Sequence, residues 1–207
     1  MAEIKIVYID DQIDPMLSKY ISEVYCSNPY TIETTKQEVR KKYSEVKFES
    51  GQGYKSLLQD TDIRSANVVL IDNHLFEERS AEAGKFSGKQ FKVIFRKLLP
   101  FVEVLIITQD QSLVGNNIIH KFSGRHGEDI NLYYKGHLDN ILDVAIKEVM
   151  DFESLADDLN KSTDVEKVLV EKIMQSLQGD DSYDALTKAD IDDLISSFKE
   201  LKDSYGH

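Results

Sequence analysis

The chain has little cysteine and no tryptophan: Cys26 is the single thiol among 207 residues. One thiol cannot form a disulfide within a chain, and it cannot supply a cluster of thiolate ligands for zinc. The sequence therefore excludes a small disulfide-stapled domain, and we expect a cytoplasmic location. The five histidines have no regular metal-ligand spacing, so a histidine metal site is not expected either.

Long apolar runs are also missing. No stretch approaches the roughly 18 apolar residues that a membrane-spanning helix needs. The N-terminus lacks a basic segment followed by an apolar one, which is the pattern of a secretory signal. We therefore expect no membrane association.

Positive charge is scarce, with 25 Lys and Arg against 37 Asp and Glu and a formal net charge of -12. This balance argues against a general affinity for nucleic acid, so no nucleic-acid partner is expected. The imbalance is uneven, because residues 151–207 hold six Lys, no Arg and 15 acidic residues. The shift predicts a domain over residues 1–150 and an acidic extension over residues 151–207.

Hydrophobic periodicity predicts the fold class. Apolar, β-branched runs predict strands at 4–10, 67–72, 102–108 and 130–134, with a weaker candidate at 46–50. Helical spacing is present at 16–25, 37–43, 54–58, 89–99 and 138–150. Alternation of strands and helices is typical of an α/β fold with a parallel sheet.

Polar side chains stand at the carboxyl ends of the four stronger strand candidates. Asp10 and Asp11 end the first run, and Asp72 ends the second. Thr108 ends the third, and Lys135 follows the fourth. Adjacent carboxylates repel each other, so Asp10 and Asp11 mark either a solvated turn or a cation site. In a doubly wound sheet such strand ends meet at one crevice, so we expect these five residues to converge.

This constellation resembles the receiver domain of two-component response regulators, of the CheY-like superfamily, over residues 4 to about 150. The resemblance implies a flavodoxin-like, doubly wound sheet of five parallel strands with a C-terminal α-helical extension. It implies that Asp72 accepts a phosphoryl group and that Asp10, Asp11 and Asp72 bind Mg²⁺ with the backbone carbonyl of His74. Oxygen ligands of this kind suit Mg²⁺.

The resemblance extends to three further positions. Thr108 matches the hydroxyl that follows the phosphoryl group in the family's switch, and Lys135 matches the lysine that completes the site. Gly88 matches the glycine that begins the family's third helix. Gln109 departs from the pattern, since the family usually has a small residue at this position, which controls access to the phosphoacceptor.

The acidic extension predicts two amphipathic helices, around 165–177 and 187–201. Their apolar faces have three possible partners: the preceding domain, a second copy of the chain in a homodimer, or another protein. The stretch between them lacks the glycine and the terminal glutamate of a calcium-binding loop, so an EF-hand is not expected.

Three hypotheses for function follow. The first is a signalling phosphoprotein, not an enzyme, that receives a phosphoryl group on Asp72 from a histidine kinase or phosphotransfer protein and acts on an unknown downstream protein. The second is a pseudo-receiver adaptor that binds partners without phosphorylation. Gln109, Gly136, which stands where the family usually has Pro after the lysine, and the long 73–87 segment favour it. The third, a phosphohydrolase of the haloacid dehalogenase type, is weaker, because "DDQID" does not place an Asp two residues after the nucleophile.

Overall fold

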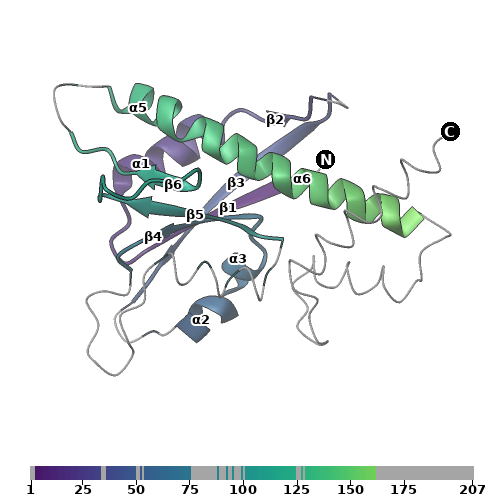
Figure 1. Cartoon of the computed structure of the whole chain (residues 1–207), viewed down its shortest axis with the longest axis horizontal. Helices are drawn as coiled ribbons and strands as arrows, with labels where there is room; N and C mark the ends of the chain where they lie inside the picture. Colours follow the sequence, from purple (N-terminus) through teal and green to yellow (C-terminus); the bar gives the residue numbers. More distant parts are fainter. Residues whose placement is uncertain are drawn as a thin grey trace.

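The computed structural model describes residues 3–33, 36–49, 52, 54–75, 88, 92, 95, 99, 101–124, 127 and 129–161. This part of the chain is a mixed α/β unit with helices on both faces of one sheet (Figure 1). The two helices predicted in the acidic extension, and residues 76–87 of the long segment after Asp72, lie outside the described residues. No helix among the described residues is long and apolar enough to cross a membrane.

The sheet has six strands in the order β2-β3-β1-β4-β5-β6. They are β1 (Glu3–Asp10), β2 (Tyr30–Thr31), β3 (Glu38–Lys47), β4 (Val68–Asp72), β5 (Glu103–Thr108) and β6 (Ile118–His120). Five strands are parallel, whereas the two-residue β2 pairs antiparallel with β3 at the edge. The prediction of five strands is corrected accordingly, because β2 adds an edge strand too short to leave a hydrophobic pattern.

The order of the parallel strands positions the site. Numbered along the chain, they follow the order 2-1-3-4-5, which is compatible with a flavodoxin-like fold. The order reverses at β1, which has β3 on one side and β4 on the other. Ligands of such sheets bind outside the carboxyl ends of the strands at this reversal, so the ends of β1 and β4 mark the expected site.

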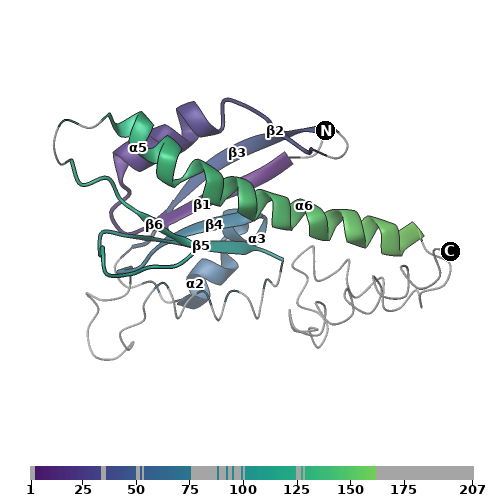
Figure 2. The same ribbon diagram turned by 45° about the horizontal axis from the view of Figure 1, so that its top comes forward.

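Two groups of helices cover the sheet. One face carries α1 (Pro15–Lys19), the π-helix η1 (Tyr20–Tyr25), α5 (Ile130–His137) and α6 (Asp139–Lys161), and the other carries α2 (Tyr54–Gln59) and α3 (Thr61–Arg64) (Figure 2). Alternate side chains of β1 feed the two cores: Tyr8 belongs to the first and Ile9 to the second. Because both faces are covered, the strands are apolar on both sides, as their sequences predicted.

Three predicted strands are confirmed: 4–10, 67–72 and 102–108 correspond to β1, β4 and β5. All residues of β4 and β5 are buried, which explains why their apolar runs are continuous. The predicted helix at 138–150 corresponds to α6, which continues to Lys161. The division of the chain near residue 150 stays a prediction, since most of the proposed extension lies outside the described residues.

The predicted strand at 130–134 is wrong, because these residues form helix α5. Asp129 caps this helix: its carboxylate accepts hydrogen bonds from the backbone N–H groups of Asn131 and Leu132. Tyr134 and Leu138, four residues apart, are fully buried, which is helical spacing. The fifth parallel strand is instead β6, which lies earlier in the chain.

The predicted helix at 37–43 is also wrong, since this segment belongs to strand β3. Buried Val39 and Lys41 alternate with exposed Arg40 and Lys42, which is the period of a strand. The strand was difficult to predict because one of its inward-facing residues is a lysine. The weaker strand candidate at 46–50 overlaps only the last residues of β3.

Candidate functional site

Lys121 joins the ends of β1 and β4. Its Nζ lies 2.8 Å from Asp10 Oδ2 and 2.8 Å from Asp72 Oδ1. Both carboxylates are buried, at 1% and 5% exposure. Burial opposes the charge on Lys121, but hydrogen bonds and the charges of Asp10 and Asp72 outweigh it and raise its pKa. The three side chains therefore form a buried ionic cluster at the point where the strand order reverses.

The sequence places Lys121 there because it follows β6 directly. In the register of the sheet, His120 of β6 pairs with Thr108 of β5, and the Lys121 backbone N–H donates to the Thr108 carbonyl at 2.8 Å. The lysine therefore leaves the sheet at the same edge as the two aspartates. Its long stem can then reach across β5 to the carboxylates of β1 and β4.

Asp10 is further held by its own strand. Its Oδ1 accepts a hydrogen bond from the Gln12 backbone N–H at 3.0 Å, and its Oδ2 accepts one from the phenol of Tyr8. Tyr8 and Asp10 are two residues apart on β1, so their side chains share one face of the sheet. Burial, followed by the nearby charge of Asp10, raises the pKa of the Tyr8 phenol, so this hydroxyl remains a donor.

Asp72 ends β4, and its backbone lies close to Gly88. Its Oδ2 accepts a hydrogen bond from the His74 backbone N–H at 2.7 Å. Gly88 is helical, and its N–H donates to the Asn73 carbonyl at 3.0 Å. A Cβ on Gly88 would come within 2.7 Å of the Asp72 carbonyl oxygen. Glycine is therefore required at this position, where the sequence placed a helix start.

A pocket of about 590 Å³ opens over this cluster. Its wall includes Asp10, Asp11, Asp72, His74, Gln109 and Lys121. Burial, followed by the neighbouring carboxyl groups of Asp10 and Asp72, raises the pKa of Asp11. The pocket thus combines concentrated negative charge with one cation. Gln109 also lies on its wall.

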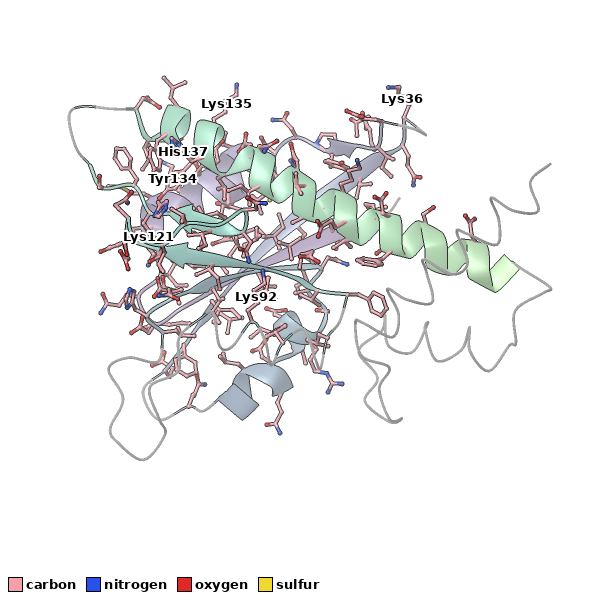
Figure 3. All side chains as sticks on the ribbon, viewed as in Figure 1. Lys36, Lys92, Lys121, Tyr134, Lys135 and His137 are labelled. Carbon is pink, nitrogen blue, oxygen red and sulfur yellow. The ribbon has the colours of Figure 1, made fainter. Side chains whose placement is uncertain are left out.

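Lys135, the lysine predicted for the site, is elsewhere. It lies on α5 and lines a different pocket, between η1 and α6 (Figure 3). The prediction is wrong because the fourth apolar run is a helix, so the residue after it does not follow a strand. Figure 3 shows Lys121 beside the strand ends and Lys135 away from them on α5.

Thr108 ends β5 and has no exposed surface. Its Oγ1 accepts a hydrogen bond from the Asp110 backbone N–H at 3.0 Å. The structure therefore places Thr108 at the same edge of the sheet as Asp72 and Lys121. The sequence predicted this position for Thr108 and Asp72. Its side chain is covered, and it does not form part of the pocket wall described above.

The chemistry of the donor set fits Mg²⁺, since three carboxylates surround one pocket and the ion prefers oxygen ligands. In the folded chain, Lys121 lies between two of these carboxylates, those of Asp10 and Asp72. Within the described residues, no group of three His, Cys, Asp or Glu side chains is positioned to hold a metal ion.

No protein-family model and no curated protein matches the chain. Three solved chains are similar to it. All three are RcsB response regulators. RcsB from Salmonella enterica serovar Typhimurium, bound to the promoter rprA with the phosphomimetic BeF3-, is 13% identical, with a TM-score of 0.37 over 93% of this chain and 99% of that one.

The other two have comparable values. An RcsB–DNA complex is 9% identical, with a TM-score of 0.37 over 94% of this chain and 98% of that one. RcsB of Salmonella typhimurium is 12% identical, with a TM-score of 0.39 over 95% of this chain and 100% of that one. Similarity of this degree does not assign the chain to a family.

This comparison corrects one expectation. Net charge predicted that the chain has no nucleic-acid partner, whereas two of the similar chains are bound to DNA. We therefore no longer exclude a nucleic-acid partner. Its physical weakness is that net charge sums over the whole chain and does not describe any single surface.

Two site residues were missed from sequence. Lys121 follows "NNIIH", whose apolar core of two residues is too short to stand out as a strand. Its position in the sequence is the signal that could identify Lys121. It is the first lysine after Thr108 and comes shortly after two adjacent isoleucines. For Tyr8 the signal is its spacing of two from Asp10, which puts both side chains on one face of a strand.

Proposed function

We propose that this chain is a receiver-like signalling protein that accepts a phosphoryl group on Asp72 and acts through contacts with other proteins. In the reaction, an Asp72 carboxylate oxygen attacks the phosphorus of a donor. The bond from phosphorus to the donor's leaving group breaks, and the leaving group departs with its electron pair. The product is an aspartyl phosphate, and no substrate is turned over.

The observation that carries this proposal is the cluster of Asp10, Asp72 and Lys121 at the reversal of the strand order. Asp72 ends the strand next to β1 and borders an open pocket, so a donor can reach it. Lys121, within 2.8 Å of Asp72, is in place to neutralise charge on a phosphoryl oxygen. A cation held this close to the nucleophile stabilises both the transition state and the product.

Thr108 supplies the proposed response. Its Oγ1 already accepts one hydrogen bond, from Asp110, and a hydroxyl has one proton to donate. A phosphoryl oxygen on Asp72 would be an acceptor for that proton. Because Thr108 is buried at the end of β5, movement of its side chain would shift the start of the following loop, where Gln109 and Asp110 lie.

Asp10, Asp11 and the Asp72 carboxylate would hold Mg²⁺, with the His74 carbonyl as a further ligand. The ion, when bound, supplies positive charge that offsets repulsion between three carboxylates and an anionic donor. The chain's own contribution is to hold the carboxylates: Gln12 and His74 each fix one oxygen with a backbone N–H. Release of Asp10 from Lys121 and Tyr8 would free its other oxygen.

A second candidate is an adaptor that keeps the fold and binds partners without phosphorylation. The contacts of Asp10 favour it: Lys121 and Tyr8 both occupy Oδ2, which a metal ion would need. In this alternative Lys121 is a permanent substitute for the metal.

The test is phosphorylation by acetyl phosphate with Mg²⁺, followed by intact-mass measurement. We expect a gain of one phosphoryl group on the native chain, no gain in Asp72→Asn, and a strong loss in Lys121→Met. Lys135→Met is the matched control and should be modified like the native chain. A native chain that gains no phosphoryl group would support the adaptor instead, and equal loss in both lysine variants would exclude the assigned role of Lys121.

A further inference from the structure

A second pocket of about 540 Å³ lies between η1, β3 and α6, and neither the sequence nor the proposed function accounts for it. Lys41, which borders it, pairs with Ile4 in the register of β1, six residues before Asp10. At about 3.3 Å per residue this is roughly 20 Å from the phosphoacceptor site. Its volume is within the usual range for small-molecule sites.

The π-helix shapes the aromatic side of this pocket. In η1, Tyr20 and Tyr25 are five residues apart, which is the hydrogen-bond spacing of a π-helix, and both line the pocket. The Tyr20 hydroxyl donates to Asp139 Oδ1 at 2.7 Å, and the Tyr25 hydroxyl donates to Asp143 Oδ1 at 2.6 Å. Asp139 and Asp143 are one turn apart on α6. The spacing of the two phenols on η1 thus matches the spacing of the two carboxylates on α6.

Lys41 is the unusual member of the wall. The residue is only 9% exposed, and its Nζ lies 3.6 Å from the centroid of the Tyr25 ring. Among the described residues its ammonium has no hydrogen-bond acceptor and no ion-pair partner within contact distance. Lys41 lines the pocket with most of its stem covered, so a ligand that brings an acceptor can pair with its ammonium.

The charges around Lys41 define that ligand. The wall also carries Lys135 and Glu33, so it holds two cations and three carboxylates. A simple anion would meet the carboxylates as well as the two lysines. Asp139 and Asp143 each use Oδ1 for a tyrosine, which leaves Oδ2 for a donor on the ligand. A molecule with an anionic and a cationic group close together satisfies both requirements.

We propose that this pocket binds a small zwitterion of the α-amino acid class. Lys41 receives the carboxylate of the ligand, and Asp139 and Asp143 receive its ammonium. The rings of Tyr20 and Tyr25 contact its side chain. The proposal does not depend on phosphorylation of Asp72.

The test is thermal unfolding of the full chain with a panel of free L-amino acids, each also supplied as its N-acetyl and its methyl-ester derivative. We expect at least one amino acid to raise the melting temperature at millimolar concentration, and both of its derivatives to lose the effect. Each derivative removes one of the two charges, so this pattern reports recognition of the zwitterion. A panel with no effect on the native chain overturns the proposal.

Variants then locate the effect. Lys41→Met should weaken binding of the active amino acid roughly tenfold or more, since a charge-assisted contact is removed. Lys42→Met is the matched control, because Lys42 is the next residue of β3 and its side chain is 60% exposed. Lys42→Met and Asp72→Asn should bind like the native chain. Native-like binding by Lys41→Met would overturn the assignment to this pocket.

Discussion

At the scale of single residues, Lys121 has the largest expected effect on stability. Its removal leaves Asp10 and Asp72 buried beside each other without a cation. Lys121→Met should lower the free energy of unfolding at pH 7 by about 3 kcal/mol, as for other buried pairs that lose one partner. Urea denaturation of the two chains measures this difference.

Lys135→Met provides the comparison for this prediction. Lys135 is exposed on α5, so its substitution should change stability by less than about 0.5 kcal/mol. Equal stability of the Lys121→Met and native chains would contradict the ionic cluster.

The two lysines also show what the sequence could predict at this scale. Asp10, Asp11, Asp72 and Thr108 were assigned to one edge of the sheet because each ends or directly follows a run whose strand character is plain. The lysine was misassigned because its position depends on β6, a strand of three residues with a single apolar pair. A side chain can be located from sequence only as well as the element that carries it.

Cys26 gives a prediction about pH. Burial raises the pKa of its thiol from 9.0 to about 11, although the charge of Lys41 acts in the opposite direction. Since the thiolate is the reactive form, alkylation by iodoacetamide at pH 8 should be about a hundredfold slower in the folded chain than in the unfolded one. Equal rates at pH 8 in buffer and in denaturant would contradict the raised pKa of the partly buried Cys26 thiol.

At the scale of elements, Gly88 is packed against the end of β4 and the residue that follows it. A Cβ at Gly88 would meet the backbone of Asp72 and Asn73, which cannot rotate away. Gly88→Ala should therefore lower the free energy of unfolding by about 2 kcal/mol, the cost of overpacking. Chemical denaturation checks the value.

Gly136→Ala is the matched substitution. Gly136 lies on α5, and a Cβ there would meet nothing within 4 Å. Alanine is the better helix former, so this variant should gain about 0.5 kcal/mol. If both alanine variants were equally stable, the close approach at Gly88 would be wrong.

Helix α5 depends on its N-cap. The Asp129 carboxylate accepts hydrogen bonds from two backbone N–H groups of the first turn, at 2.8 and 3.0 Å. Asp129→Ala should lower the free energy of unfolding by about 1 kcal/mol. Asp129→Asn retains the accepting oxygen, so it should keep most of this stabilisation. A large loss of stability in Asp129→Asn would argue against the cap.

The elements predicted correctly are those in which local and tertiary preferences agree. β1, β4 and β5 are β-branched and buried on both faces, so propensity and burial give the same answer. In α5, the strand-prone "INLYY" is overruled by the Asp129 cap and by packing of Tyr134 and Leu138 in the core. In β3, the inward-facing residue Lys41 interrupts the alternation of apolar and polar residues that predicts a strand.

At the scale of the whole molecule, the strand order brings residues from separate parts of the sequence together at one site. Asp10, Asp72, Thr108 and Lys121 come from four neighbouring strands, β1, β4, β5 and β6, and no two of them are adjacent in the sequence. The convergence of the first three could be predicted from the α/β pattern alone. Sequence could not predict the ion pairs of Lys121 with Asp10 and Asp72, because they depend on the tertiary fold.

The central claim, that Asp72 is a phosphoacceptor supported by Lys121, is tested most directly by thermal unfolding with Mg²⁺ and beryllofluoride, a phosphoryl mimic. A ligand that binds only the folded chain raises its melting temperature. We predict that the pair of ligands stabilises the native chain and Lys135→Met, but not Asp72→Asn or Lys121→Met. The absence of a shift in the native chain, or an undiminished shift in Asp72→Asn, would contradict the claim.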